Sequence, residues 1–190
     1  MKSLKQFTLV VLFTILVLPT SAQKFSLDNE TSFLQVLGTS TLHDWYIQVE
    51  NQTGFIQFED VTTNKVAKLE FSTESESFKS GKKGMDKKTY KALRTDEFKT
   101  IKFSLTAVKS VSDNSSNQFK LTAVGNLTIC GVTKSIELQF DCEKKDNLIV
   151  LSGAHKMLMT DFGIDPPKAL LGTIKTGDEI EVKFKSIFIN

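Results

Sequence analysis

The side chains with the clearest chemical potential are two histidines, one of which has a carboxylate beside it. His43 directly precedes Asp44, and His155 stands alone much further along the chain. An imidazole next to a carboxylate can act as a general base. A hydrolytic relay also needs a nucleophile in a recognisable setting, and the chain has neither a Gly-x-Ser-x-Gly nor a His-Glu-x-x-His motif. The histidines therefore fit hydrogen bonding at a strand end or polar contact at a cavity mouth better than catalysis.

A second feature is the basic segment 79–102. It contains nine Lys or Arg against three Asp or Glu, so its net charge is 9 − 3 = +6, whereas the whole chain carries only +2. Such a run usually forms a solvated face. The sharper hypothesis is that Lys87, Lys88 and Lys91 meet an anionic head group or an anionic membrane surface. The near balance of charge over the whole chain does not support a general affinity for nucleic acid.

The stretch 119–142 predicts a hairpin that must position much of the rest. Phe119, Leu121 and Leu127 share one parity with Ile129, and polar residues take the other parity. After a corner at Gly131-Val132, apolar residues continue at positions 136, 138, 140 and 142. This alternation is typical of two antiparallel strands that bury one face.

The hairpin also bears on the cysteines. Cys130 would lie beside the corner and Cys142 several residues along the return strand, which is far beyond the ~7 Å Cα separation of a disulfide. We therefore expect two buried free thiols. Two cysteines and two distant histidines show none of the paired spacings of a zinc site, so no metal is predicted.

The remaining pattern predicts an all-β fold. Alternating segments recur about every ten residues and give about eight strands, while segment 85–93 loses the alternation and carries good helix formers. An eight-stranded antiparallel barrel removes the exposed sheet edges. Its interior is just wide enough for one small ligand. Alternation alone does not separate a filled barrel from a hollow one.

Four stretches in order resemble the YceI-like family. Residues 125–134, Gly-Asn-Leu-Thr-Ile-Cys-Gly-Val-Thr-Lys, are similar to the family's G-D-L-T-(I/L)-H-G-V-T-(K/R) motif. The others are residues 38–45 (Gly-Thr-Ser-Thr-Leu-His-Asp-Trp), 85–93 followed by 101–103, and 161–164 (Asp-Phe-Gly-Ile). The chain departs from the family at Cys130, where histidine is frequent, and at Lys88 and Thr89, where a His-Leu pair is common.

The resemblance implies a lipocalin-like barrel with a long apolar cavity for a polyisoprenoid or a quinone-like lipid. It would act without a cofactor of its own, and a homodimer is compatible with the family. The inward-parity residues then become cavity lining, and a second set would lie at the mouth or head group. The expected lining residues are Leu69, Phe71, Phe103, Leu105, Phe119, Leu121, Leu127, Ile129, Ile136, Leu138, Phe140, Val182 and Phe184. The expected mouth residues are His43, Trp45, Lys87, Lys88 and Lys91.

Residues 1–22 have the layout of a secretory signal peptide. Two lysines precede an uncharged run from Phe7 to Leu18, and small residues precede a cleavage site after Ala22. We therefore expect an exported protein, periplasmic or extracellular in a bacterium, whose barrel domain spans residues 23–190.

The expected function is non-enzymatic binding or carriage of an amphiphilic lipid, with transient contact to a membrane surface. Two alternatives remain open from the sequence. One is a filled barrel that protects against stress or binds a partner through its surface. The other is an enzyme that modifies a lipid through His43 or His155.

Overall fold

The computed structural model describes residues 23–115, 117–145 and 147–190. The expected signal peptide, residues 1–22, lies outside the described residues. The strands are β1 Gln23–Leu27, β2 Phe33–Ser40, β3 Trp45–Val49, β4 Gln52–Asp60, β5 Lys65–Glu74, β6 Phe78–Lys79, β7 Thr100–Ser115, β8 Gln118–Ile129, β9 Val132–Lys145, β10 Leu148–Leu158, β11 Lys168–Ala169 and β12 Ile174–Ile189. The helices are α1 Lys83–Leu93 and the short 3₁₀ turns η1 Ser75–Ser77, η2 Met159–Phe162 and η3 Leu170–Gly172.

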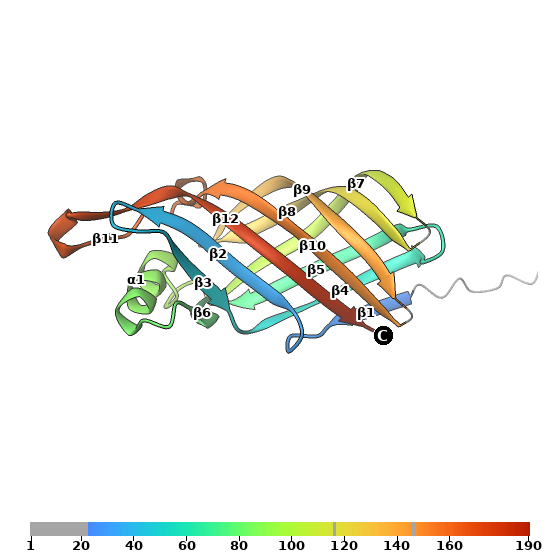
Figure 1. The fold of residues 1–190 in the computed structure, drawn as a ribbon, viewed down its shortest axis with the longest axis horizontal. Coiled ribbons are helices and arrows are strands. Elements are labelled where there is room, and N and C mark those ends of the chain that lie inside the picture. The colour runs from blue at the N-terminus through green and yellow to red at the C-terminus, as the bar shows by residue number, and fades with distance from the viewer. Residues whose placement is uncertain (1–22, 116, 146) are drawn as a thin grey trace, which may run out of the picture.

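The strands close into an antiparallel barrel, as the sequence predicts (Figure 1). The circuit runs β1-β4-β5-β7-β8-β9-β10-β12 and returns to β1 through the β1–β12 pairing. β2 continues the line of β1 along β12, and β3 pairs with β2 just before the chain enters β4. The barrel therefore has eight strands around its circumference, and β1 and β2 share one of these positions, because each pairs with a different part of β12.

The central hairpin forms β8 and β9. Its alternation is confirmed: Phe119, Leu121, Leu127 and Ile129 are buried, and polar residues lie between them. Ile129 pairs with Val132, so the turn consists of Cys130 and Gly131, one position earlier than the predicted corner. Both turn residues have positive φ, 50° and 77°, which a two-residue turn between right-twisted strands requires.

The single α-helix predicted for 85–93 is present among the described residues and begins two positions earlier, at Lys83. Met85, Thr89 and Ala92 face the barrel at helical spacing, and Leu93 is buried. Arg94 ends the helix in the left-handed conformation. Within the described residues no helix combines the length and the apolar character needed to cross a membrane.

The end of the barrel opposite α1 is filled. Phe25 and Phe58 meet edge to face with ring centroids 6.1 Å apart, and both are essentially inaccessible to solvent. Phe119 is equally buried in this half. Lys144 reaches from β9 to the β4–β5 turn, where its Nζ donates to the Val61 carbonyl at 2.9 Å and lies 5.7 Å from the Phe119 ring centroid. We call this half the closed end, and the half that carries α1 the mouth end.

Candidate functional site: an apolar cavity at the mouth end

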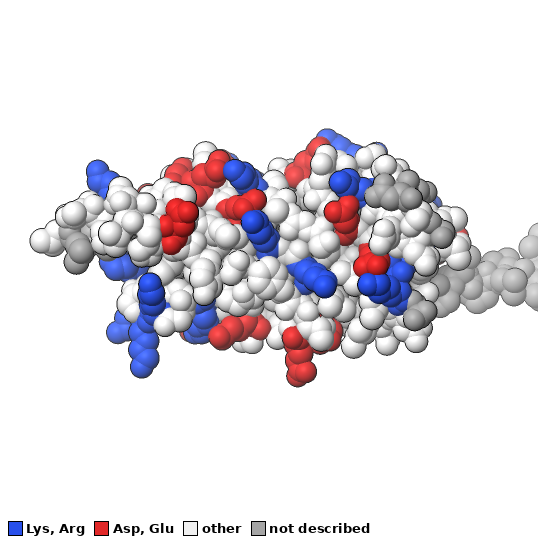
Figure 2. Space-filling view, viewed as in Figure 1, with Lys and Arg blue, Asp and Glu red and all other residues white. Residues whose placement is uncertain are grey.

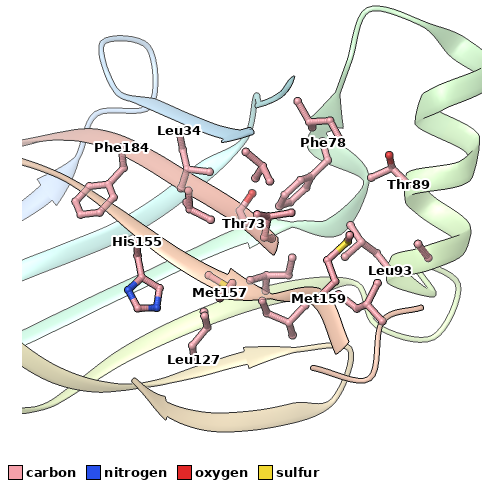
Figure 3. A pocket seen from close by; sticks show the side chains of 18 of the residues that line it. Leu34, Thr73, Phe78, Thr89, Leu93, Leu127, His155, Met157, Met159 and Phe184 are labelled. Atoms are coloured by element: carbon pink, nitrogen blue, oxygen red, sulfur yellow. The ribbon is translucent and has the colours of Figure 1, made fainter. Parts of the chain in front are cut away.

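A cavity of about 430 Å³ opens at the mouth end of the barrel, and its lining reaches as far as Ser186 and Phe188 of β12. Its volume lies within the range of small-molecule binding pockets. Inward-facing residues of the barrel strands form its wall, and the inner face of α1 and the segment after η2 frame its opening (Figure 3). Most of the exposed wall is contributed by apolar side chains, so the cavity offers a ligand dispersion contact and exclusion of water.

Ten of the thirteen expected lining residues lie on this wall. They are Leu69, Phe71, Phe103, Leu127, Ile129, Ile136, Leu138, Phe140, Val182 and Phe184. The period-two pattern placed them because a residue's face in a strand is set by its parity. Parity does not say how far along the barrel the space is open.

Three expected lining residues do not border the cavity. Phe119 and Leu121 have the inward parity, but they lie in the closed half, where neighbouring side chains leave no space. Leu105 precedes a register shift in β7 and borders a separate hollow with Val66 and Val108. Alternation predicted that these residues point inward. No simple sequence pattern shows where side chains fill the barrel, or where the register of β7 shifts.

The sequence reasoning missed several wall residues. Met157 and Met159 continue the inward parity of β10, so the alternation contains the signal that identifies them. Met85 and Ala92 follow from the amphipathic face of α1. Ile164 comes from the loop after η2, where no periodic pattern points to it.

Trp45 lies on the rim of the mouth because the residue beside it is glycine. Gly38 pairs with Trp45 across β2 and β3, and a Cβ at Gly38 would lie 2.2 Å from the indole Cζ2. The indole Nε1–H donates to the Thr39 carbonyl at 2.9 Å. The motif therefore needs glycine at position 38, because any larger residue there would displace the Trp45 ring from the opening.

His43 also borders the cavity, but it does not form an acid–base pair with Asp44. Its Nδ1 lies 2.6 Å from the Asp44 backbone carbonyl, which accepts the hydrogen bond. The Ser40 hydroxyl closes the same turn by donating to the His43 carbonyl at 2.7 Å. These contacts shape the β2–β3 loop and leave the Asp44 carboxylate out of the pair that the sequence suggested.

Of the three expected lysines, only Lys88 reaches the cavity wall. Its Nζ donates to the Lys168 carbonyl at 2.9 Å and so links α1 to the β11 segment across the mouth. Lys87 and Lys91 do not border the cavity; they are exposed on the outer face of α1. The helical period causes this split, since only residues on the Met85–Thr89–Ala92 side turn inward.

His155 lies deeper. It is on β10 opposite Val182, farther from α1 than Met157 and Met159 are (Figure 3). Burial lowers the pKa of its imidazole below the ordinary value of histidine. No carboxylate, serine or cysteine hydrogen-bonds either histidine ring within the described residues, so no relay is assembled there.

The two cysteines are buried at opposite ends of the β8–β9 hairpin and are not bridged. The Cys130 thiol donates to the Leu93 carbonyl at 3.2 Å beneath the end of α1. Burial raises the pKa of Cys130, and that of Cys142 in the closed half to about 12. Among the described residues no three His, Cys, Asp or Glu side chains come together as a metal site.

The Asp161-Phe-Gly-Ile motif anchors η2 beside the mouth. Asp161 forms an ion pair with Lys134 of β9 at 2.7 Å, and that hydrogen bond is the main cause of the lowered pKa of the Asp161 carboxyl. Phe162 is buried, and Gly163 ends the turn at a φ of 67°. The motif thus has a structural role that brings Ile164 to the cavity wall.

The comparisons with known proteins agree with this fold. The family model described as YceI-like domain matches residues 25–188. No curated protein matches the sequence.

Solved structures share the architecture at low sequence identity. BcnA of Burkholderia cenocepacia superposes with a TM-score of 0.68 at 15% identity, over 85% of this chain and 98% of that protein. A polyisoprenoid binding domain of Saccharophagus degradans, implicated in plant cell wall breakdown, gives 0.69 at 12% identity, over 87% and 97%. The YceI protein of Campylobacter jejuni gives 0.56 at 20% identity, over 75% and 82%. At these identities the likeness concerns the fold.

Proposed function

The chain belongs to the YceI-like domain family, and we propose that it is a non-enzymatic binding protein that holds a polyisoprenoid, a quinone-like lipid or a comparable amphiphile in its barrel. The observation that carries the proposal is the apolar cavity of about 430 Å³ that opens at the mouth end. The Saccharophagus degradans domain, a polyisoprenoid binding domain by description, supports the choice of ligand class.

Burial of the lipid tail supplies the affinity. About ten methylene groups at about 0.8 kcal/mol each contribute about 8 kcal/mol, which corresponds to roughly micromolar binding before the costs of association. The tail needs no hydrogen bond, so a wall of bulky apolar residues is sufficient. No cofactor takes part in this mechanism.

Native mass spectrometry of the gently purified protein tests the proposal. We expect a mass excess that disappears on denaturation, and solvent extraction should recover an isoprenoid or quinone-like lipid. The matched control is Val182→Phe, whose ring projects into the cavity from the middle of β12. If the wild-type protein neither retains a lipid nor takes one up when supplied with farnesylacetone or a short quinone, the filled-barrel alternative replaces the proposal.

We further propose that the mouth end docks on an anionic membrane surface to exchange this lipid. Figure 2 shows basic side chains gathered over the part of the molecule that carries α1. Lys83, Lys87 and Lys91 repeat every four residues, so they form one exposed row. Leu42 of the β2–β3 loop, with 66% of its surface exposed, and Leu171 of η3, fully exposed, lie at the same end.

Charge and apolar contact would act together at this surface. Each lysine near an anionic leaflet contributes about 1 kcal/mol, and the attraction weakens as salt is raised. The exposed leucines at the same end can enter the interfacial region while the cavity faces the bilayer.

Co-sedimentation with vesicles separates these contributions. Wild-type protein should bind phosphatidylglycerol vesicles at low salt and phosphatidylcholine vesicles much less. Lys87→Glu/Lys91→Glu should abolish the difference, and Leu42→Ser should weaken binding at every salt concentration. The matched control is Lys24→Glu/Lys68→Glu, which reverses two charges that flank Gln57 on neighbouring strands of the barrel wall. Equal binding by the two double variants would rule out docking through α1.

We also propose that the protein is exported. The expected cleavage after Ala22 predicts a mature protein that begins at Gln23 and occurs outside the cytoplasm. N-terminal sequencing of the protein from cell fractions tests it, and an uncleaved cytoplasmic chain would contradict it. A homodimer would appear as a doubled mass in the native spectra.

A further inference from the structure

The deep part of the cavity wall contains an ionisable group that the burial of a hydrocarbon tail does not use, the imidazole of His155. The other ionisable wall residues of the described chain are His43, Lys88 and Lys168, and all three belong to the segments that frame the mouth. Along β10 the neighbouring inward side chain toward the mouth is that of Met157. Strand parity therefore directs a polar ring to a place where its neighbours are apolar.

The surroundings of His155 fix its depth. Two residues further along β10, Gly153 pairs with Phe140 on one side and Phe184 on the other. Those two rings meet edge to face, with centroids 6.4 Å apart, and they fill the space over Gly153, where a Cβ would come 3.0 Å from Phe184. The imidazole thus lies one inward position toward the mouth from an aromatic pair. A lipid that enters past α1 reaches it before it reaches these rings.

The ring has no hydrogen-bond partner within the described residues. The hydroxyl of Thr73, another polar wall group, already donates to the Asn51 carbonyl at 2.6 Å. Since burial lowers the pKa of His155, its ring is neutral at neutral pH and offers one N–H donor and one acceptor. A pure hydrocarbon that covers this ring removes it from water without replacing its hydrogen bonds, which is costly.

We propose that His155 is a specificity-determining residue that hydrogen-bonds an oxygen atom of the bound lipid, so that the cavity prefers tails bearing a carbonyl or hydroxyl oxygen over hydrocarbons of equal length. This inference rests on the proposed lipid-binding function and deepens it. A carbonyl oxygen accepts the imidazole N–H, whereas a hydroxyl can donate or accept. The selected lipid therefore carries its oxygen within the barrel.

Displacement of the apolar dye N-phenyl-1-naphthylamine measures the selectivity. The probes are farnesylacetone, farnesol and the hydrocarbon of the same length that lacks oxygen. We expect wild-type protein to bind the two oxygenated probes about three- to tenfold more tightly than the hydrocarbon, the range of one hydrogen bond. In His155→Leu the ratio should fall to about one, chiefly because the hydrocarbon binds better.

Three control variants separate this role from a change in packing. His155→Gln keeps a donor and an acceptor and should retain part of the ratio. Met157→Leu alters the neighbouring inward position on β10 and should leave the ratio unchanged. Ser186→Ala removes a buried wall hydroxyl further along β12, and it too should have no effect.

The outcomes distinguish this inference from the function on which it rests. An unchanged ratio in His155→Leu, or a ratio lost in Ser186→Ala instead, would overturn the role of His155 and leave lipid binding intact. Failure of every probe to displace the dye from the wild-type protein would overturn lipid binding and the selectivity together.

Discussion

The two halves of the barrel are built from the same eight strands, but one half is filled with side chains and the other contains the cavity. In the closed half, Phe25, Phe58 and Phe119 are almost completely buried, and Lys144 fastens the β4–β5 turn across the end. In the mouth half, residues of the same inward parity, such as Leu138 and Val182, stay partly exposed because they border the cavity. The difference shows that alternation creates an apolar interior, whereas the size and closeness of side chains decide whether that interior is solid.

The hydrogen bonding of the halves differs as well. β9 and β10 pair from Leu148–Lys145 to Gly153–Phe140, and among the described residues this pairing does not continue toward the mouth. There η2 is tied to β9 instead, through the ion pair of Lys134 with Asp161. Fewer ladder bonds and fewer packed side chains predict that the mouth half opens locally at lower free energy than the closed half.

The largest effect should come from emptying the closed end. Phe58→Ala removes a ring that is 0% exposed, and the cavity it leaves should lower the free energy of unfolding by about 3–5 kcal/mol. Urea unfolding followed by circular dichroism measures this loss. The folded fraction should bind the apolar dye with wild-type affinity. A weaker stability effect than that of Leu138→Ala would mean that the halves are not packed differently.

Filling the mouth half should have the opposite effect: it should weaken lipid binding and leave the stability nearly unchanged. Val182→Phe places a ring in open space, so we expect unfolding free energy within about 1 kcal/mol of wild type and lipid binding at least tenfold weaker. A graded series with Val182→Ile as the intermediate should show affinity falling as side-chain volume rises. Dye titration and urea unfolding on the same samples test it. A strongly destabilised Val182→Phe would show that the space is unavailable in solution.

The sequence predicted the fold more fully than the site, for a physical reason. Period-two alternation identifies inward residues such as Leu127 and Phe140, because face is a local property of a strand. Whether an inward residue meets another side chain or open space depends on residues distant in sequence. Phe119 and Leu121 were therefore placed on the correct face but not on the cavity wall.

The helix and the motifs illustrate the same limit. The loss of alternation predicted α1, but the inner face of the helix decides that Lys88 and not Lys87 or Lys91 reaches the cavity. The sequence suggested that His43 and Asp44 could form an acid–base pair, but the backbone carbonyl of Asp44, not its carboxylate, accepts the hydrogen bond from His43. His155, which belongs to no sequence motif, lies on the cavity wall, and its ring has no hydrogen-bond partner in the part of the chain that the structure describes.

A smaller effect tests how the rim is built. Gly38→Ala adds a Cβ 2.2 Å from the Trp45 ring, so the indole must leave its place on the rim, at an expected cost of about 1–3 kcal/mol in stability. Tryptophan fluorescence should shift, because the chain has a single tryptophan. Gly84→Ala is the matched control. Nothing lies within 4 Å of its added Cβ and the site is helical, so that variant should gain up to about 1 kcal/mol.

The labelling rates of the two cysteine thiols measure how readily each half opens, and this test needs no mutation. Cys142 lies in the closed half with a pKa of about 12, so at pH 8 it should react with a maleimide only when the whole barrel unfolds. Cys130 is covered by the end of α1. The backbone carbonyl of Cys130 accepts a hydrogen bond from the Arg94 guanidinium at 2.8 Å. Undocking of the helix alone should expose it, and peptide mass spectrometry should find it labelled first.

Arg94→Ala should sharpen that difference by loosening only the mouth end. Loss of a hydrogen bond from a charged donor and of the stacking of Arg94 on the Phe98 ring, 4.6 Å away, should raise the labelling rate of Cys130 about three- to tenfold. The labelling rate of Cys142 should stay the same, because the closed half keeps its packing. A parallel rise at both cysteines would mean that the barrel opens as one cooperative unit and that the mouth has no separate mobility through which a lipid could enter.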